Sequence, residues 1–222
     1  MSQSQSESES ATLAKLAATG IIAVLRAPTT ESALGTVEAL VTGGITGIEV
    51  TYSTPGAAMV IAECARRYGT DILLGAGTVT TVAQAEEAAD AGAAFLVSPG
   101  TVPSLANAMR ATGAAIMLGA MTPTELMTAV SLGSIAVKIF PASLGGPSYL
   151  KSLRGPFPDT PLMPTGGVTA ANLSDWLDAG AIAVGAGGDL CPSAVIAAGR
   201  YDEIESIARG FAAALRSARG AR

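Results

Sequence analysis

The sequence contains no histidine among its 222 residues. This absence excludes histidine general bases, histidine-ligated metals, and the Ser-His-Asp and Cys-His nucleophile systems in their usual form. Charged residues are also scarce, at 14% of the chain against about a quarter in a typical domain. The net charge of −5 and the pI near 4.7 are opposite to the basic face that nucleic acid requires, so no nucleic-acid partner is expected.

Cysteines and long apolar runs are few as well. Cys64 and Cys191 form no CxxC pair, are too few for a zinc site and indicate no disulfide framework, which favours a reducing cytoplasm. No apolar run reaches the roughly 18 residues of a membrane span, so no membrane partner is expected. Residues 1–10, MSQSQSESES, lack the basic start and apolar core of a signal peptide, and their polar composition predicts a disordered leader.

The remaining chain, residues 11–222, alternates short apolar runs with alanine-rich amphipathic stretches. Eight such runs occur, at residues 21–25, 47–51, 72–75, 94–97, 115–118, 135–140, 161–163 and 182–185. Alternating strands and helices imply a parallel sheet that is buried on both faces. Eight units, preceded by an extra N-terminal helix near Thr12–Ala18, predict an α/β protein with a single (β/α)8 TIM-barrel domain. An open doubly wound sheet is the alternative, although no GxGxxG motif follows the first run.

Two of the expected helices have clear end signals. Thr122 is expected to cap one helix, with Glu125 three residues later as its capping-box partner. A second helix is expected over Thr169–Ala179, capped by its first residue and stopped by Gly180. These signals place one helix between the fifth and sixth apolar runs and another between the seventh and eighth.

Lys138 is the one lysine of three that lies inside an apolar run. Strand parity turns Ile135, Val137 and Ile139 towards the helices, so Lys138 is expected to point into the barrel. Burial disfavours the charged form of an amine, and a neutral amine attacks carbonyl groups to form a Schiff base. The alternatives are a lysine that snorkels to the rim and one that merely pairs with an internal carboxylate.

Glu49 lies in the middle of the second run, between Ile48 and Val50, which are expected to face the helices. A carboxylate in this position is costly unless it is paired or takes part in chemistry. If Glu49 and Lys138 both point inward, they supply the general acid/base and the nucleophile that imine chemistry needs. The alternative is a purely structural buried ion pair.

Candidate anion-binding groups follow three of the runs. Arg26 ends the first run, where its guanidinium can bind a carboxylate or a phosphate, and a rim salt bridge is the alternative. Glycine turns follow the seventh and eighth runs, at residues 165–167 and 185–188. Glycine lets backbone N–H groups approach an anion, and these two loops form the common phosphate site of TIM barrels. Ordinary tight turns are the alternative, and Asp189 is expected to point away or to cap the next helix.

Eight stretches of the sequence, taken in order, resemble the 2-dehydro-3-deoxyphosphogluconate/4-hydroxy-2-oxoglutarate (KDPG/KHG) aldolases, the class I aldolases of the Entner–Doudoroff route. The stretches are IIAVLRA (21–27), GGITGIEVTYSTP (43–55), LLGAGTV (73–79), FLVSPG (95–100), MTPTEL (121–126), VKIFPA (137–142), LRGPFPDTPLMPTGGV (153–168) and AVGAGG (183–188). The resemblance extends from about Leu13 to the last helix. It implies a (β/α)8 barrel assembled as a homotrimer, and a Schiff-base mechanism that requires no metal or other cofactor.

The resemblance also implies roles for individual residues. Lys138 matches the Schiff-base lysine of a KxFP motif, Glu49 matches the acid/base glutamate, and Thr78 matches a residue near the pyruvate carboxylate. Substrate-binding residues are expected at the strand ends and in the matched motifs, namely Arg26, Thr78, Pro99, Phe140, Thr165, Gly166, Gly167, Gly187 and Gly188.

Two positions depart from the family pattern. Ser53 stands where many members carry a carboxylate-binding arginine, so that contact is assigned to Arg26, which matches an A[VI]LR stretch of other members. Gly188 stands where many members carry a phosphate-binding serine, which leaves a backbone N–H group for the phosphate. Thr165 favours the gluconate-derived substrate, because the similar galactonate-type aldolases usually lack this threonine.

The expected activity is cleavage of 2-dehydro-3-deoxy-6-phosphogluconate to pyruvate and glyceraldehyde 3-phosphate. A second expected substrate is 4-hydroxy-2-oxoglutarate, which gives pyruvate and glyoxylate. The alternatives are a 2-dehydro-3-deoxy-6-phosphogalactonate aldolase, a metal-dependent aldolase, a phosphosugar isomerase or epimerase, and a non-catalytic phosphometabolite-binding protein. The lack of histidine disfavours the metal-dependent enzyme, and an isomerase leaves the buried lysine unexplained.

Overall fold

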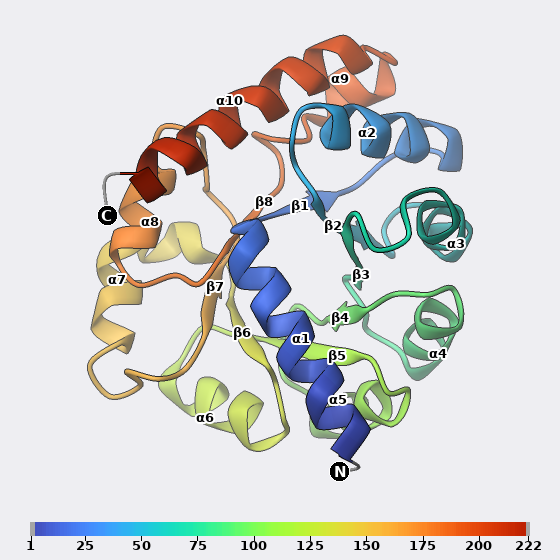
Figure 1. Cartoon of the computed structure of the whole chain (residues 1–222). Coiled ribbons are helices and arrows are strands. Elements are labelled where there is room, and N and C mark those ends of the chain that lie inside the picture. Colours follow the sequence, from blue (N-terminus) through green and yellow to red (C-terminus); the bar gives the residue numbers. More distant parts are fainter. Residues whose placement is uncertain (1–2, 221–222) are drawn as a thin grey trace.

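The structure, a computed structural model, describes residues 3–220, and its eight apolar runs form parallel strands around one interior (Figure 1). The strands are β1 Ile21–Leu25, β2 Gly47–Thr51, β3 Leu73–Gly77, β4 Phe95–Val97, β5 Ala115–Ala120, β6 Ala136–Ile139, β7 Leu162–Pro164 and β8 Val184–Ala186. Consecutive strands pair from β1 to β7, and β1 also pairs with β8. The predicted TIM barrel is confirmed and the open doubly wound sheet is wrong, because strand order follows chain order around the ring.

The barrel closes between β7 and β8 through a narrow seam. An isolated parallel bridge joins Thr165 to Gly185, and the Ile182 N–H group donates to the Leu162 carbonyl oxygen at 3.0 Å. A side chain at Gly185 would place its Cβ 2.2 Å from Thr165 Oγ1, so glycine is what allows Thr165 to lie in the seam. The two residues at the closure are therefore the first residues of the two glycine turns.

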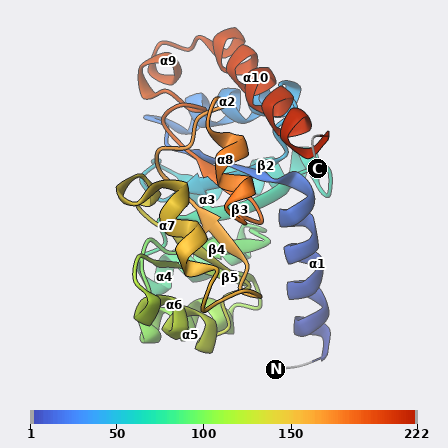
Figure 2. The same ribbon diagram turned by 90° about the vertical axis from the view of Figure 1, so that its left-hand side faces the viewer.

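Helices alternate with the strands and cover the outside of the barrel (Figures 1 and 2). They are α2 Thr30–Thr42, α3 Ala57–Tyr68, α4 Val82–Asp90, α5 Pro103–Ala111, α6 Pro123–Ser131, α7 Gly146–Leu153, α8 Leu173–Asp178, α9 Ser193–Ala197 and α10 Tyr201–Gly220, with a short 3-10 helix η1 at Ala142–Leu144. The predicted capping box of Thr122 and Glu125 is confirmed at the start of α6. Helix α8 begins later than predicted, because Thr169 and Asn172 bond to each other in a turn before it. Within residues 3–220, no helix combines the length and the apolar character needed to cross a membrane.

Helix α1, Gln3–Thr19, lies across the amino ends of the strands and closes that end of the barrel (Figures 1 and 2). We call the half of the interior next to α1 the lower half, and the half at the carboxyl ends of the strands the upper half. The Leu16 side chain of α1 reaches the barrel interior and is fully buried. The predicted disordered leader is therefore wrong for residues 3–10, which are helical, while residues 1–2 lie outside the described residues. The polar segment contains no proline or glycine that would stop a helix anchored at Leu16.

Two cations hold α1 in place. Lys15 Nζ donates to the Thr70 carbonyl oxygen at 2.6 Å, which ties the helix to the loop before β3. Arg219, on α10, donates to the carbonyl oxygens of Ala17 and Ala18 at 2.6 and 2.7 Å. The end of a helix leaves carbonyl groups unpaired and favours a nearby cation. The last helix of the chain thus caps the first.

Two apolar clusters fill the structure, one between strands and helices and one inside the barrel. Val137 and Ile139 belong to the outer cluster and Ala136 to the inner one, so the predicted parity is confirmed for β6 itself. Ile135 differs and packs against the inner cluster, because it precedes β6 and is not held by the alternation of the strand. The inner cluster consists of Leu16, Ile22, Leu73, Phe95, Val97, Ala115, Met117, Ala136, Met163 and Ala183.

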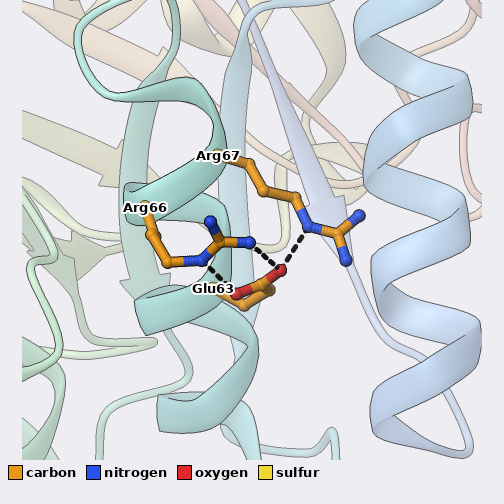
Figure 3. A network of polar contacts seen from close by, with 3 residues as sticks. All are labelled: Glu63, Arg66 and Arg67. Atoms are coloured by element: carbon orange, nitrogen blue, oxygen red, sulfur yellow. Dashed lines mark hydrogen bonds and ion pairs between the residues drawn. The ribbon is translucent and has the colours of Figure 1, made fainter.

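The outer face of α3 carries a polar network that is separate from the barrel interior (Figure 3). Glu63 Oε1 lies 2.8 Å from Arg66 Nη2 and 2.5 Å from Arg67 Nε. Hydrogen bonds from the two guanidinium groups lower the pKa of Glu63 from 4.5 to about 2. The network is exposed to solvent, and ion pairs of this kind along a helix contribute little to stability.

Candidate active site

Two charged side chains meet inside the upper half of the barrel, near the carboxyl ends of the strands. Lys138 on β6 and Glu49 on β2 point inward from opposite sides, and their Nζ and Oε1 atoms lie 3.3 Å apart. Lys138 is 4% exposed and Glu49 is 0% exposed, so the barrel shields the pair from solvent. A lysine that snorkels to the rim is therefore the wrong interpretation.

A glycine on the neighbouring strand makes room for the carboxylate. A side chain at Gly77, on β3, would place its Cβ 1.9 Å from Glu49 Oε1. Glu49 Oε2 is buried and has no hydrogen-bond partner within residues 3–220. A buried polar oxygen without a partner is unfavourable, and a bound substrate or a water molecule can satisfy it. One carboxylate oxygen thus contacts the amine, and the other is available to a ligand.

A cavity of about 100 Å³ lies beside Lys138 at the carboxyl ends of the strands. This volume is below the roughly 300–1,000 Å³ of sites for drug-sized molecules, so the cavity suits a small ligand. It is lined by Val24, Arg26, Lys138, Phe140, Thr165, Gly166, Gly167, Val168, Gly187, Gly188 and Asp189. The structure therefore brings together most of the predicted site residues, from the ends of β1, β6, β7 and β8.

Thr78 and Pro99 follow β3 and β4 and do not line this cavity. Thr78 is half-buried and has a φ of 55°, the one positive φ of a non-glycine residue in the described part of the chain. Such a conformation is strained for a β-branched residue, and strain of this kind concentrates at functional sites. Pro99 is exposed. Both residues lie at the same end of the barrel as the cavity, but outside it.

The anion-binding candidates lie at the mouth of the cavity. Arg26 is exposed and has no carboxylate partner among residues 3–220, so the rim salt bridge is the wrong alternative. Gly166 and Gly167 have φ values of 98° and 75°, which side chains rarely adopt, so this turn needs its glycines. Gly187 and Gly188, which follow the neighbouring strand β8, also line the cavity. The mouth thus combines one guanidinium group with backbone that a ligand can approach closely.

Sequence reasoning missed two of the lining residues and misplaced a third. Val24 has the same inward parity as Ile22, which is a signal that would have identified it. Val168 follows the glycine turn, and no sequence pattern marks it. Asp189 is exposed and borders the cavity, and it does not cap the next helix, because Pro192 is the residue at the N-cap of α9.

The two cysteines do not provide a competing nucleophile. Burial raises the pKa of Cys64 to about 11 and that of Cys191 to about 12. Both groups are therefore protonated at neutral pH, and the thiol form is a poor nucleophile. An amine and a carboxyl group 3.3 Å apart, by contrast, can pass a proton between them while the amine attacks a carbonyl carbon. The arrangement can thus form and resolve a Schiff base.

Comparison with known proteins points in the same direction. The family model described as KDPG and KHG aldolase matches residues 13–207. A 2-dehydro-3-deoxy-phosphogluconate aldolase from Treponema pallidum is 37% identical over 194 residues, which cover 85% of this chain and 90% of that protein. A 2-dehydro-3-deoxy-6-phosphogalactonate aldolase from Escherichia coli K12 is 35% identical over 171 residues, which cover 77% of this chain and 83% of that protein.

A solved structure extends the likeness to three dimensions. It is a KDPG aldolase from Legionella pneumophila with pyruvate captured as a covalent carbinolamine intermediate, and it matches with a TM-score of 0.83 at 33% identity, over 90% of this chain and 97% of that one. The family model and these relatives each span well over two thirds of the chain. The chain therefore belongs to the KDPG and KHG aldolases and is a class I carbon–carbon lyase.

Proposed function

We propose that this aldolase cleaves 2-dehydro-3-deoxy-6-phosphogluconate to pyruvate and glyceraldehyde 3-phosphate through a Schiff base on Lys138. The observation that carries the proposal is the buried contact of 3.3 Å between Lys138 and Glu49, beside a small cavity with Arg26 at its mouth. Lysine supplies the nucleophile and glutamate moves the protons, so the reaction needs no metal or other cofactor. Cleavage of 4-hydroxy-2-oxoglutarate to pyruvate and glyoxylate follows the same steps.

The first half of the reaction breaks the carbon–carbon bond. Lys138, in its neutral form, attacks the C2 ketone and forms a carbinolamine, which loses water as Glu49 delivers a proton to the departing hydroxyl group. The protonated imine then acts as the electron sink. Glu49 removes the proton of the C4 hydroxyl group, the C3–C4 bond breaks, and its electron pair moves towards the imine nitrogen to give an enamine and a free aldehyde.

The second half restores the enzyme. Glu49, now protonated, returns a proton to C3 of the enamine, and water hydrolyses the resulting imine to pyruvate and free Lys138. Covalent catalysis divides one difficult cleavage into easier steps. Every proton passes through Glu49, whose Oε2 atom has no other partner in the described structure.

The remaining predicted residues bind the substrate in this proposal. Arg26 holds the carboxylate at C1, with Thr78 as a further contact to that group and Pro99 at the rim. The backbone N–H groups of the turns at 165–167 and 187–188 hold the phosphate. Thr165 Oγ1 is buried without a hydrogen-bond partner among the described residues, which supports a role in binding. The Phe140 ring, with its centroid 5.5 Å from Lys138 Nζ, covers the amine.

The configuration of the preferred sugar acid is tested by comparing substrates. Relatives named for gluconate and for galactonate substrates are about equally similar to this chain, and Thr165 favours the gluconate-derived one. Release of pyruvate should be measured with both phosphorylated substrates and with 4-hydroxy-2-oxoglutarate. The highest kcat/KM for the gluconate-derived substrate supports the proposal. The highest value for the galactonate-derived substrate overturns the assigned substrate and leaves the mechanism intact.

Borohydride trapping tests the mechanism directly. Reduction in the presence of pyruvate should add the mass of a reduced pyruvyl group to the peptide that contains Lys138. Glu49→Gln should slow cleavage by about 10²–10⁴-fold and still permit trapping, because the amine is intact. An unmodified Lys138 peptide under turnover conditions would overturn the mechanism and favour an isomerase, an epimerase or a binding protein. Loss of activity in EDTA would favour a metal-dependent aldolase.

The proposal extends to assembly and location: the enzyme is a homotrimer in the cytoplasm. Met59, Val82 and Val102 are 64%, 45% and 53% exposed and lie at the N-terminal ends of three neighbouring helices, α3, α4 and α5. Apolar side chains gathered on one end of a barrel favour an interface with another copy. The free thiols of Cys64 and Cys191 favour a reducing cytoplasm. Sedimentation equilibrium should give a trimer, and a monomer at all concentrations would contradict it.

A further inference from the structure

The backbone on both sides of Arg26 is held by the segment that follows β2. Thr51 Oγ1 donates to the carbonyl oxygen of Leu25, the residue before Arg26, at 2.8 Å. The N–H group of Ala27, the residue after Arg26, donates to Thr54 Oγ1 at 3.1 Å. Thr51 is 0% exposed and Thr54 is 2% exposed, so water does not compete for these bonds. The two peptide groups that flank Arg26 are thus tied to one loop.

Ser53 adds a third hydroxyl group to this arrangement. Its Oγ atom lies 2.7 Å from Thr51 Oγ1. A threonine hydroxyl group has one proton, and that of Thr51 is donated to the carbonyl oxygen of Leu25, so Ser53 is the donor in this bond. The bond fixes the rotamer that directs Thr51 at the first strand. We refer to Thr51, Ser53 and Thr54 as the hydroxyl clamp.

The Arg26 side chain itself has no comparable support. It is exposed and has no carboxylate partner within residues 3–220, and it borders two spaces. One is the cavity beside Lys138, and the other is a shallow groove of about 460 Å³ towards α9. An arginine side chain has many accessible rotamers, so a free one samples both spaces. The direction in which the side chain leaves the backbone is therefore what biases the guanidinium group towards the cavity.

We propose that the hydroxyl clamp consists of positioning residues for Arg26, and that it sets the affinity of the enzyme for the carboxylate of the keto acid. The inference rests on the proposed function, in which Arg26 holds that carboxylate. Fixing a binding group before the substrate arrives removes part of the entropic cost of binding. The clamp touches neither the amine nor the carbonyl carbon, so it acts on KM rather than on the chemical step.

Thr51→Val and Thr54→Val test the clamp, because each removes a hydroxyl group and keeps the shape. In the direction of aldol synthesis, each should raise KM for pyruvate by about tenfold and leave kcat within about twofold, while trapping at saturating pyruvate is unchanged. Thr51→Ser, which keeps the hydroxyl group, should restore KM. Ser53→Ala, at an exposed position, should raise KM by about threefold and keeps the test valid if the buried variants fold poorly. Thr36→Val is the matched control.

The control removes an equally buried hydroxyl group from a helix. Thr36 is 0% exposed, and its Oγ1 atom donates to the Ser32 carbonyl oxygen at 2.7 Å within α2. Thr36→Val should leave KM and kcat for pyruvate unchanged. An increase in KM as large as that of Thr51→Val would show that loss of any buried hydroxyl group has this effect, and would overturn the clamp.

A double-mutant cycle with Arg26→Ala separates the two proposals. Arg26→Ala should raise KM for pyruvate, and Thr51→Val should add nothing further in that background. If Arg26→Ala leaves KM unchanged, the assigned role of Arg26 is wrong, although trapping at Lys138 still tests the aldolase mechanism. If Arg26→Ala raises KM and Thr51→Val does not, the clamp alone is overturned. Equal effects of Thr51→Val in both backgrounds would also overturn it, because the effect would not pass through Arg26.

Discussion

The two halves of the barrel interior are built by the same strands, yet they differ in packing and in charge. On β6, Ala136 belongs to the lower apolar cluster, and Lys138, two residues later, forms the buried pair. On β5, Met117 fills the lower half, whereas Gly119 makes room for the backbone of Pro99, whose carbonyl oxygen would lie 2.1 Å from a Cβ at that position. The lower half is packed and uncharged, and the upper half contains a cavity and an ion pair. On β6, the residue that packs the core and the residue next to the cavity are therefore successive residues on the same inward face.

The comparison also shows why the two halves occur together. A buried ion pair and an unfilled space do not stabilise a fold, because desolvation of the charges offsets their attraction. Apolar burial below the pair provides the favourable term, at about 25 cal/mol per Å². If this separation holds, substitutions in the upper half of the interior should affect catalysis more than stability. Substitutions in the lower half should affect stability more than catalysis.

The largest effect is expected for Lys138→Ala. Without the amine no Schiff base forms, so kcat/KM should fall by about 10⁵-fold or more, as for removal of other covalent nucleophiles. Removal of one partner leaves Glu49 buried and unpaired, so the unfolding temperature should fall as well, and activity is compared well below it. Lys151→Ala, at an exposed position of α7, is the matched control and should retain activity. Residual cleavage by Lys138→Ala within tenfold of the parent would contradict the assignment of the nucleophile.

The lower half is tested by Leu16→Ala. Leu16 is 0% exposed and closes the interior from α1, so its truncation should lower the free energy of unfolding by about 2–5 kcal/mol. Chemical denaturation measures this change, and kcat/KM should stay within about twofold of the parent. Met127→Ala, at a position that is 61% exposed, should have little effect on either quantity. A loss of activity in Leu16→Ala that matches its loss of stability would mean that the two halves are not independent.

Gly77→Ala tests whether catalysis depends on the position of the Glu49 carboxylate. The added Cβ would lie 1.9 Å from Glu49 Oε1, so the carboxylate must move away from Lys138. We expect kcat/KM to fall by about tenfold to a hundredfold, and overpacking to cost about 1–3 kcal/mol of stability. Gly210→Ala on α10 is the control, because its Cβ meets nothing within 4 Å. That change should raise stability by about 0.5–1 kcal/mol and leave activity unchanged. Full activity in Gly77→Ala would show that the carboxylate position is not critical.

The smallest effect lies outside the barrel, at Glu63 on α3. Its pKa is about 2 in the folded protein and 4.5 in the reference state, so its contribution to stability is present above about pH 4.5 and is lost as pH falls through about 2. Glu63→Gln should lower the unfolding temperature slightly at neutral pH, and the difference from the parent should shrink over that range. Glu86→Gln, at an exposed position on α4, is the matched control for the loss of one surface carboxylate. A difference that grows on acidification would contradict the sign of this effect.

Much of the fold could be predicted from the sequence. The apolar runs at 21–25 and 47–51 coincide with β1 and β2. Strand β3 extends two residues beyond its run, to Gly77, because pairing with β2 holds these residues in the sheet although neither has a large apolar side chain. The helical state of residues 3–10 was not predictable from polarity alone, because it depends on the anchoring of α1 beneath the barrel.

The inward orientation of Lys138 and Glu49 was predictable for a different reason than the features around them. Strand alternation alone directs Lys138 and Glu49 inward, whatever the rest of the fold does. The bond from Thr51 to the Leu25 carbonyl oxygen depends instead on the register of β1 and β2, in which Leu25 pairs with Val50. Register is set by the whole sheet. The position of Asp189 depends similarly on where α9 begins, and no local pattern fixes that residue.

The seam between β7 and β8 has a consequence for how the enzyme holds its ligand. Within residues 3–220, this seam is held by the bridge from Thr165 to Gly185 and the bond from Ile182 to Leu162, without the paired strand register that joins the other neighbouring strands, so the barrel should open most easily here. The glycine turns at 165–167 and 185–188 begin on either side of the seam, so a phosphate bound by both turns would join the two strands further. Amide hydrogen exchange along these two strands should therefore slow more than elsewhere when ligand binds. The barrel of the empty enzyme would open at this seam more often than that of the ligand-bound enzyme.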